Sequence, residues 1–174
     1  MSVITNISQV GSDVIRSTAE PAALPLSTET RHLITDMVDT MRFAELVGIA
    51  APQVGHGLRI FVTEVRRTTY RNEGLDKLRV FVNPEIVSQS EDTEVIYEGC
   101  GSVAHGDLFG EVSRPKTITL RYYDENSVAH TEEFTGVLAR VIQHELDHLN
   151  GTVFLDKLTT TKTVKSANEY RKKI

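Results

Sequence analysis

Hydrophobic residues recur along the chain at two different spacings, and these predict helices and strands respectively. Apolar positions three and four residues apart predict one helix from Glu29 to about Phe43 and a second from Val137 to Leu149. Ser27 and Thr28 are suitable caps for the first helix, and Asn150-Gly151 supplies a stop signal after the second. Both predicted helices are therefore amphipathic and bounded by recognisable end signals.

Shorter apolar runs, most of them between the two helices, predict strands. In the clearest case apolar and polar residues alternate from Lys116 to Tyr123, as expected for a half-buried strand. Strands followed by a helix that packs on them favour an α+β fold, with mostly antiparallel sheets packed around the central helix at 137–149. The predicted strands are Arg59 to Val65, Arg79 to Val87, Glu94 to Tyr97, Lys116 to Tyr123 and Val128 to Thr135.

Two further segments carry weaker patterns. Val47 to Gly57 is punctuated by glycine and proline and is predicted as a loop. Thr161 to Arg171 has only a thin apolar stripe and is predicted as a last helix. Because no internal repeat or linker composition divides the chain, we expect a single domain over residues 1–174, with 161–174 as a helical or mobile tail.

The composition excludes several classes of protein. Of the 174 residues, 40% are hydrophobic and 25% are charged, which fits neither a disordered nor a membrane protein. The net charge of −5, from 19 basic and 24 acidic residues, argues against a dedicated nucleic-acid surface. One cysteine cannot form an internal disulfide, and the first residues lack a signal-peptide pattern. We therefore expect a cytoplasmic protein, or one of an organellar matrix if the source is eukaryotic, without a membrane segment or dedicated DNA binding.

The clearest chemical motif lies inside the second predicted helix, as Gln143-His144-Glu145-Leu146-Asp147-His148. Histidines four residues apart lie on one helix face about one turn apart, so both imidazoles can bind a single metal ion. Glu145 lies beside the first histidine, where its carboxylate can accept a proton from water activated by that metal. A solvated charged face is the alternative, but the whole pattern on a strongly periodic helix favours a metal site.

Two histidines leave such a site incomplete, since a catalytic metal usually has three protein ligands and one open position. Cys100 lies between Gly99 and Gly101, and glycines allow the backbone to approach a ligand closely. A lone cysteine is more often a small buried hydrophobic residue, but together with the helix motif we favour Cys100 as the third ligand. The remaining histidines have no partner spacing and are predicted at the surface: His32, His56, His105 and His130.

Three segments, in this order, resemble the motifs of the peptide deformylase family. The first is Gly48-Ile49-Ala50-Ala51-Pro52-Gln53, the second is Glu98-Gly99-Cys100-Gly101-Ser102, and the third is the helix motif from Gln143 to His148. The likeness covers nearly the whole chain. Arg140 and Val103 are similar to the mitochondrial and plant-like branch of that family.

The resemblance implies a metal-dependent hydrolase that removes the formyl group from formyl-methionine at the start of nascent polypeptides and releases formate. It implies that Cys100, His144 and His148 hold one divalent ion, usually iron(II), with zinc or nickel as alternatives. A bound metal lowers the pKa of water from ~15.7 toward ~7 and so supplies hydroxide at neutral pH.

The resemblance also assigns roles to residues around the metal. Glu145 would act as general base and then as the acid that protonates the leaving amine. The side-chain amide of Gln53 and the backbone N–H of Gly101 would bind the oxyanion, each worth about 3 kcal/mol. The expected substrate-binding residues are Gly48 and the methionine-pocket residues Val47, Ile96, Val137 and Val141.

Two positions depart from the usual pattern of the family. Leu46 stands two residues before Gly48, where the family usually has glycine, and Gly101 stands where it usually has leucine. The oxyanion contact at Gly101 is a backbone N–H, so the chemical step survives, whereas Leu46 adds bulk near the substrate groove. From the sequence alone, Gly101→Leu is expected to lower KM for a formyl-methionyl peptide, provided that the backbone there is not left-handed.

Two other functions stay open at this point. A metalloprotease would use the same helix motif but needs a third ligand after it, and no histidine follows His148, while Glu169 lies in the weakly patterned tail. A catalytically weak deformylase-like protein could instead bind peptides or the ribosome. Ribosomal RNA would suit the basic residues of the C-terminal tail, although simple exposure of this tail to solvent explains them more easily. These residues are Lys162, Lys165, Arg171, Lys172 and Lys173.

Overall fold

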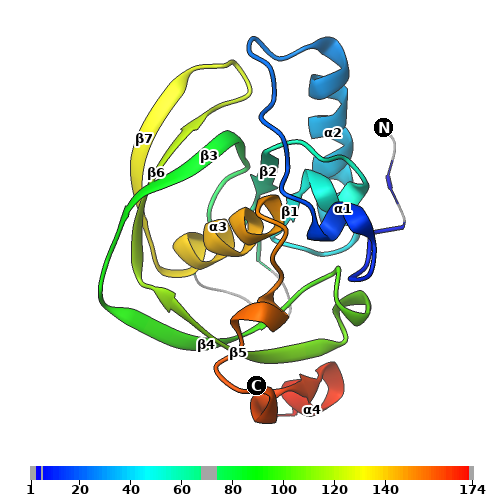
Figure 1. Ribbon diagram of the computed structural model, residues 1–174, viewed down its shortest axis with the longest axis vertical. Coiled ribbons are helices and arrows are strands. Elements are labelled where there is room, and N and C mark those ends of the chain that lie inside the picture. The colour runs from blue at the N-terminus through cyan, green and yellow to red at the C-terminus, as the bar shows by residue number, and fades with distance from the viewer. Residues whose placement is uncertain (1–2, 5, 68–73, 173–174) are drawn as a thin grey trace.

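The computed structural model describes residues 3–4, 6–67 and 74–172, and within these ranges it is an α+β fold (Figure 1). The helices are α1 (Asp13–Arg16), α2 (Thr28–Phe43), α3 (Gly136–Leu149) and α4 (Ala167–Arg171). The strands are β1 (Gly48–Ala50), β2 (Ile60–Thr63), β3 (Arg79–Gln89), β4 (Thr93–Gly99), β5 (Leu108–Pro115), β6 (Thr117–Tyr123), β7 (Ala129–Thr135) and β8 (Lys165–Ser166). Among the described helices, none combines the length and apolar character that crossing a membrane requires.

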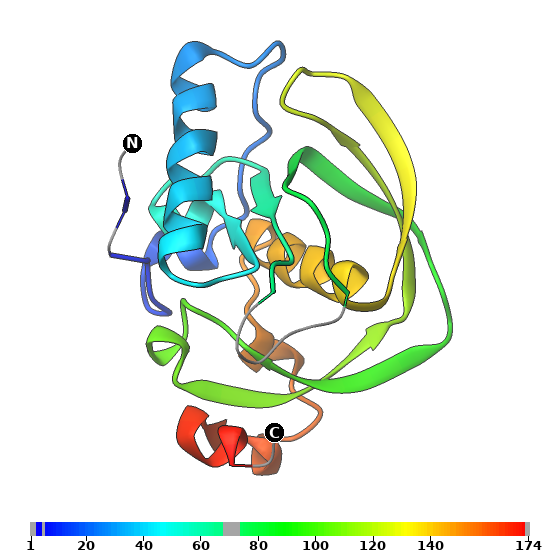
Figure 2. The ribbon, with the colours of Figure 1, turned by 180° about the vertical axis from the view of Figure 1, so that it is seen from behind.

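The larger sheet has five antiparallel strands in the order β1-β2-β3-β6-β7. The first half of β3 pairs with β2, with Val82 opposite Ile60, and its second half pairs with β6, with Gln89 opposite Ile118. Register shifts along β3 interrupt this second pairing, and such irregularities bend a strand. In Figures 1 and 2 the long strands β3, β6 and β7 accordingly curve around one side of α3.

The smaller sheet has the order β4-β5-β8, and its strands are also antiparallel. β4 ends at Gly99, opposite Phe109 of β5, so the residue that follows, Cys100, begins the turn after the strand. Glu98 lies opposite Gly110 in the same ladder and is buried. The small sheet therefore carries the second sequence motif to a fixed place beside α3.

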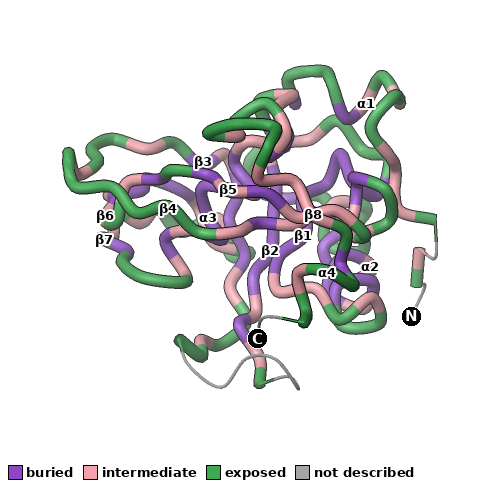
Figure 3. The backbone as a smooth tube through the Cα atoms, turned by 90° about the horizontal axis from the view of Figure 1, so that it is seen from below, coloured by how far each residue is buried: buried purple, intermediate pink, exposed green. Residues whose placement is uncertain are grey.

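Helix α3 lies in the middle of the molecule, with the large sheet on one side and β4 and β5 on the other (Figure 1). Its apolar residues Ile142, Leu146 and Leu149 are buried in one cluster with Phe61 and Phe81 of the large sheet. The view coloured by burial shows buried residues along β1, β2 and α3 (Figure 3). Because a rigid core surrounds α3 on both sides, its polar residues are held in fixed positions.

Helix α2 covers β1 and β2 with its apolar face. Ser27 is its N-cap and accepts a hydrogen bond from the backbone N–H of Thr30. Leu33, Met37 and Met41 are buried against the strands in one cluster with Ile49 and Val62. The amphipathic pattern that predicted this helix is therefore the pattern that packs it.

Most of the predicted elements are confirmed. The two helices predicted from their apolar spacing are α2 and α3, and the five predicted strands are β2, β3, β4, β6 and β7, with bounds that shift by at most two residues. The predicted α+β fold with antiparallel sheets is confirmed as well. Strand β5 was not predicted, because its run from Leu108 to Pro115 is interrupted by glycine and charged residues.

Two local predictions are wrong. Within the loop predicted from Val47 to Gly57, residues 48–50 form β1 and Ala51–Val54 form the 3-10 helix η1. A strand of three residues is too short to show alternation, and β1 is defined by its pairing with β2. In the helix predicted from Thr161 to Arg171, Thr161–Thr163 form the 3-10 helix η4 and Lys165–Ser166 form β8, because pairing with β5 holds that backbone extended. The rest of the predicted range, Ala167–Arg171, does form a helix, α4.

Candidate metal centre

The centre is built first on α3. His144 and His148 stand one turn apart on this helix, and their ring centroids are 5.2 Å apart. His148 is 1% exposed and the side chain of His144 is 14% exposed, so neither is a surface histidine. The helix therefore presents two imidazoles to the same buried space.

Cys100 enters that space from the turn after β4. Its Sγ lies 3.1 Å from Nε2 of His148, and it is 5% exposed. The ligand atoms of Cys100, His144 and His148 all lie within 4.8 Å of one another, on segments that the sequence separates widely. The structure thus brings together the three residues predicted as metal ligands.

The chemistry of this donor set fits a divalent transition metal. A thiolate and two imidazoles are borderline-soft ligands, and three protein ligands leave one position open for a reacting molecule. The Nδ1 atom of His144 contacts Oε2 of Glu98 at 3.0 Å, which fixes the ring so that Nε2 is left to face the cluster. Such a carboxylate behind a histidine is the usual support of a metal ligand.

Glu98 is the centre of a buried ionic network that sequence reasoning missed. Arg114 donates two hydrogen bonds to its carboxylate, of 2.6 and 2.9 Å, and Arg140 donates a third of 2.7 Å. Arg114 also donates a bond of 2.9 Å to Asp147 on α3. The position of Glu98 in the second motif was visible, but the strand pairing that carries Arg114 beside it was not.

The charges of the cluster stabilise one another. Burial opposes ionisation of the Cys100 thiol, but the neighbouring His148 and His144 outweigh it and hold the pKa of Cys100 well below its usual range. Burial likewise opposes protonation of His144, but Cys100 and Glu98 outweigh it and raise the pKa of His144. A thiolate is the form of cysteine that binds metal ions, so Cys100 is prepared to bind one, and metal binding would release the proton of His144, since a ligating imidazole is neutral.

Glu145 lies beside the cluster in a tightly enclosed position. It is 4% exposed, and its Oε2 has no hydrogen-bond partner among the described residues. Burial raises the pKa of Glu145 to about 7. A carboxylate with a pKa near the working pH can both accept and return a proton, which is what a general acid–base requires.

Gln53 lies in η1, and its side chain is fixed at both ends. Its Oε1 accepts a hydrogen bond of 2.8 Å from the N–H of Ala50, and its Nε2 donates one of 3.2 Å to Ser102 Oγ. The same Nε2 lies 3.9 Å from Cys100 Sγ. The amide donor predicted for the oxyanion therefore lies beside the predicted ligand Cys100.

The segment before α1 also holds this region, and no sequence motif pointed to it. Gln9 Nε2 donates a hydrogen bond of 2.8 Å to the carbonyl of Gly101, and Gln9 Oε1 accepts one of 3.0 Å from the N–H of His105. The N–H of Ser8 donates to the carbonyl of Gln53 at 2.8 Å. The segments that carry Gln53 and Gly101, which are expected to bind the oxyanion, are therefore both hydrogen-bonded to residues 8–9, just before α1.

The predicted pocket residues differ in burial. Val141 is buried at 9% exposure, whereas Ile96 and Val137 are 40% and 38% exposed and so are not ordinary core residues. Val47 is half-buried directly before β1. Ile96 lies on β4 with Glu98, and Val137 lies on α3 with His144. Their solvent-exposed apolar side chains are compatible with a pocket for an apolar side chain of the substrate.

The other four histidines lie outside the cluster. His32, His56 and His105 are exposed, as predicted. His130 is half-buried, which the prediction missed: its ring stacks on Tyr122 at 5.2 Å and contacts Asp124 at 3.1 Å.

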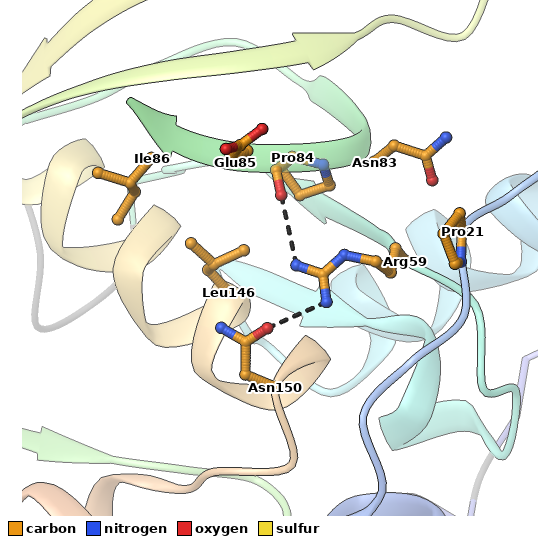
Figure 4. Close-up of a pocket in the computed structure, with 8 residues that line it drawn as sticks. All are labelled: Pro21, Arg59, Asn83, Pro84, Glu85, Ile86, Leu146 and Asn150. Carbon is orange, nitrogen blue, oxygen red and sulfur yellow. Dashed lines mark hydrogen bonds between the residues drawn. The ribbon is translucent and has the colours of Figure 1, made fainter. Parts of the chain in front are cut away.

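A cavity of about 590 Å³ lies on the other face of α3 and is not part of the centre (Figure 4). Its lining includes Leu146, which is two residues from each histidine and so about 200° around the helix. Arg59 donates hydrogen bonds to the carbonyls of Pro84 and Leu149 and to Oδ1 of Asn150. These hydrogen bonds use the donors of the Arg59 guanidinium and link the C-terminal end of α3 to β3.

Comparisons with known proteins point to one family. The sequence pattern of the family described as polypeptide deformylase matches residues 4–164. The chain is 42% identical over 156 residues to a peptide deformylase from Chlorobaculum parvum, covering 90% of this chain and 80% of that protein.

Solved structures show the same fold. The Met-Ala-Ser-bound class I type b peptide deformylase from Acinetobacter baumannii is 32% identical with a TM-score of 0.85, over 91% of this chain and 100% of that one. The peptide deformylase from Thermotoga maritima is 35% identical with a TM-score of 0.78, over 88% and 97%. Because sequence and fold agree with one family over most of its length, this chain belongs to the polypeptide deformylase family.

Proposed function

We propose that this protein removes the formyl group from the N-terminal formyl-methionine of nascent polypeptides, at the centre formed by Cys100, His144 and His148. Metal-dependent deformylation is the activity of the family to which the chain belongs. The observation that carries the proposal for these particular residues is the convergence of one cysteine and two histidines, with ligand atoms within 4.8 Å of one another, beside the buried Glu145. The metalloprotease considered from the sequence is set aside, since the family match spans residues 4–164.

The proposed ion is iron(II), held by Cys100, His144 and His148, with zinc and nickel as alternatives. The soft thiolate and two imidazoles suit all three metals, so the donor set supports the site more strongly than the identity of the ion. When bound, the ion supplies a hydroxide nucleophile at neutral pH. Glu98, held by Arg114 and Arg140, keeps the His144 ring in the orientation that ligation needs.

Glu145 is the proposed proton carrier. Its buried carboxylate accepts a proton from the attacking water and returns it to the amine that leaves as the formyl group is cut from methionine. A pKa of about 7 suits both steps near neutral pH. The absence of a side chain at Gly48 leaves the space that this carboxylate occupies, since a Cβ atom there would lie 2.5 Å from its Oε1.

Gln53 and Gly101 are the proposed oxyanion donors. Gln53 Nε2 lies near Cys100 Sγ, and the N–H of Gly101 belongs to the next residue along the chain from that ligand. Both are held before substrate arrives, Gln53 by Ala50 and Gly101 by Gln9. Donors that are already oriented need no reorganisation as charge develops on the formyl oxygen.

The proposed substrates are formyl-methionyl peptides. The related Acinetobacter baumannii structure contains Met-Ala-Ser, a peptide that begins with methionine. In this chain the proposed methionine pocket is lined by Val47, Ile96, Val137 and Val141, and Gly48 lies beside the peptide backbone. The apolar side chains of Ile96 and Val137 that are left partly exposed support this assignment.

We also propose that the protein contacts the ribosome, in the cytoplasm where nascent chains emerge. The basic residues of the C-terminal segment are the proposed contact surface. Two of them already have partners in the chain: Lys165 lies over the ring of Tyr97, and Lys172 is paired with Glu169. Lys173 lies outside the described residues.

Metal analysis of protein purified without oxygen, paired with formate release from formyl-Met-Ala-Ser, tests the proposal. One equivalent of a divalent metal and steady formate release are expected, and Cys100→Ala should lose both, since three ligands are already the minimum for an open site. His56→Ala, which changes an exposed histidine outside the cluster, is the matched control. Full metal content in Cys100→Ala would disprove the ligand assignment.

A separate measurement tests the identity of the ion. Iron(II) held by a thiolate is sensitive to oxygen, so activity should fall in air and should persist after nickel is substituted. Undiminished activity after days in air, with zinc as the metal present, would contradict iron and leave the hydrolytic function intact. Metal-loaded protein that releases no formate would favour the alternative of a peptide-binding or ribosome-binding deformylase relative.

A further inference from the structure

Gly101 is covered by the side chain of Leu46. A Cβ atom built on Gly101 would lie 3.5 and 3.6 Å from the two methyl carbons of Leu46 and 3.7 Å from Cδ1 of Ile7. These are ordinary van der Waals distances, and Gly101 is not among the glycines with a positive φ. The position therefore tolerates a side chain sterically at its Cβ, but the apolar volume beyond it is already taken by a residue from another segment.

The backbone of Leu46 is held firmly in this place. Its N–H donates a hydrogen bond of 2.9 Å to the carbonyl of Met41 at the end of α2, and its carbonyl accepts one of 2.9 Å from Arg66 Nη2. Its side chain is half-buried and packs against the cluster beneath α2. The methyl groups of Leu46 are therefore a fixed apolar surface rather than a free surface side chain.

This surface borders the proposed substrate path. Gly101 carries one proposed oxyanion donor, and Gly48, two residues after Leu46, faces the carboxylate of Glu145. The formyl carbon must lie near both that donor and that carboxylate, so the attached peptide passes close to the backbone of Gly101. The space beside Gly48 is filled by Glu145, and the side chains that border Gly101 are those of Leu46 and Ile7.

We infer that Leu46 is a specificity-determining residue for deformylation, whose methyl groups contact the bound peptide beside Gly101. Leu46 supplies from the segment before β1 the apolar wall that Gly101 cannot supply, so the two departures noted in the sequence compensate for one another. The inference rests on the proposed function, because it places the peptide by the proposed reacting groups. It also reverses the expectation from sequence alone, since a leucine at position 101 would now compete with Leu46 for the same space.

Steady-state kinetics with formyl-Met-Ala-Ser on Leu46→Ala, Gly101→Leu and the double variant test this inference. We expect Leu46→Ala to raise KM about tenfold, in the range for loss of one apolar contact in a pocket, with kcat changed less than twofold. Gly101→Leu alone should also raise KM, and the double variant should return KM to within about threefold of the parent. Leu58→Ala removes a half-buried leucine that packs against the same cluster two residues before β2, and it should leave KM unchanged.

Melting temperature and metal content are measured for every variant, so that loss of fold is separated from loss of binding. A KM within twofold of the parent in folded, metal-loaded Leu46→Ala would overturn the inference. So would a lowered KM in Gly101→Leu, or a double variant that binds no better than Leu46→Ala. The Gly101→Leu result remains decisive if Leu46→Ala does not fold.

Binding of the product peptide Met-Ala-Ser distinguishes failure of this inference from failure of the proposed function. If the parent protein releases no formate but Leu46→Ala weakens Met-Ala-Ser binding about tenfold, the role of Leu46 stands and the enzymatic proposal fails. If formate is released and Met-Ala-Ser binds all variants equally, the enzymatic proposal stands and the role of Leu46 is wrong.

Discussion

A Cβ atom on Gly48 would lie 2.5 Å from Oε1 of Glu145, so the absence of a side chain at Gly48 makes the space that the carboxylate occupies. The Cγ and Cδ atoms of Glu145 would be only 2.9 Å from the same point. Because Glu145 is 4% exposed, its carboxylate cannot move out into solvent to relieve such a contact. The first and third sequence motifs are thus joined by direct packing, and the position of the proposed base depends on it.

Gly48→Ala should therefore displace Glu145 and lower kcat for formate release by about 10²-fold, the size expected when a reacting group is misplaced by roughly 1 Å. Metal content should stay unchanged, because Gly48 does not contact the ligands through a side chain. Gly57→Ala is the control, since no heavy atom beyond its chain neighbours lies within 4 Å of a Cβ at that position. An unchanged kcat in Gly48→Ala would contradict the conclusion that close packing against Gly48 positions the carboxylate of Glu145.

Glu145→Gln separates metal binding from proton transfer. Glutamine keeps the size of the side chain but cannot accept the proton of water, so kcat should fall by about 10²–10⁴-fold while the metal remains bound. Formate release and metal analysis on the same sample check both expectations. Glu133→Gln, an exposed change on β7, should leave activity as in the parent. Turnover near that of the parent in Glu145→Gln would remove this residue from the mechanism.

The Glu98 network should give the metal-free protein a characteristic loss of stability in acid. Burial opposes the charge of Glu98, but hydrogen bonds from Arg114 and His144 outweigh it and hold the pKa of Glu98 well below its usual range. A carboxylate with a lowered folded-state pKa stabilises the fold above its unfolded-state pKa of about 4.3, and this contribution is lost as the pH falls below that value. The parent should therefore begin to lose this contribution below about pH 5 and should continue to lose it at pH 3 and below.

Urea unfolding of Glu98→Gln at pH 7 and at pH 4 measures that contribution. We expect the variant to be about 3 kcal/mol less stable than the parent at pH 7, because Arg114 loses its buried partner, and the difference should shrink at pH 4 and below. Glu85→Gln breaks an exposed pair with Arg121 and should change stability little at either pH. A constant difference between the parent and Glu98→Gln across this range would contradict a lowered pKa of Glu98.

Gln9→Ala tests whether the segment before α1 positions the proposed oxyanion donor, the backbone N–H of Gly101. The variant loses the hydrogen bonds to the Gly101 carbonyl and the His105 N–H, which together are worth about 1–3 kcal/mol of unfolding free energy. Because the Gly101 backbone is then less restrained, kcat should fall, and its fold-decrease should be about ten times the fold-change in KM. Gln89→Ala, at the exposed end of β3, is the matched control. Lost stability with an unchanged kcat would assign Gln9 a purely structural role.

The sequence by itself determined the features that depend on short spacings. The period of the apolar residues defined α2 and α3, and the interval of four residues placed His144 and His148 on one face. The order of the three motifs identified the family and the candidate ligands before any contact was known. These features could be predicted because helix geometry converts a fixed separation along the chain into a fixed separation in space.

Only the tertiary structure decided how the motifs meet. Cys100 reaches His148 because β4 and β5 pair beside α3, and Gly48 reaches Glu145 because β1 pairs with β2 under the same helix. Leu46 and Gly101 stood out in the sequence as departures from the family pattern, but neither their contact nor the hydrogen bond from Gln9 to Gly101 could be predicted from it. Contacts between residues far apart in sequence depend on strand register and on the packing of whole elements, and no local pattern encodes either of these by itself.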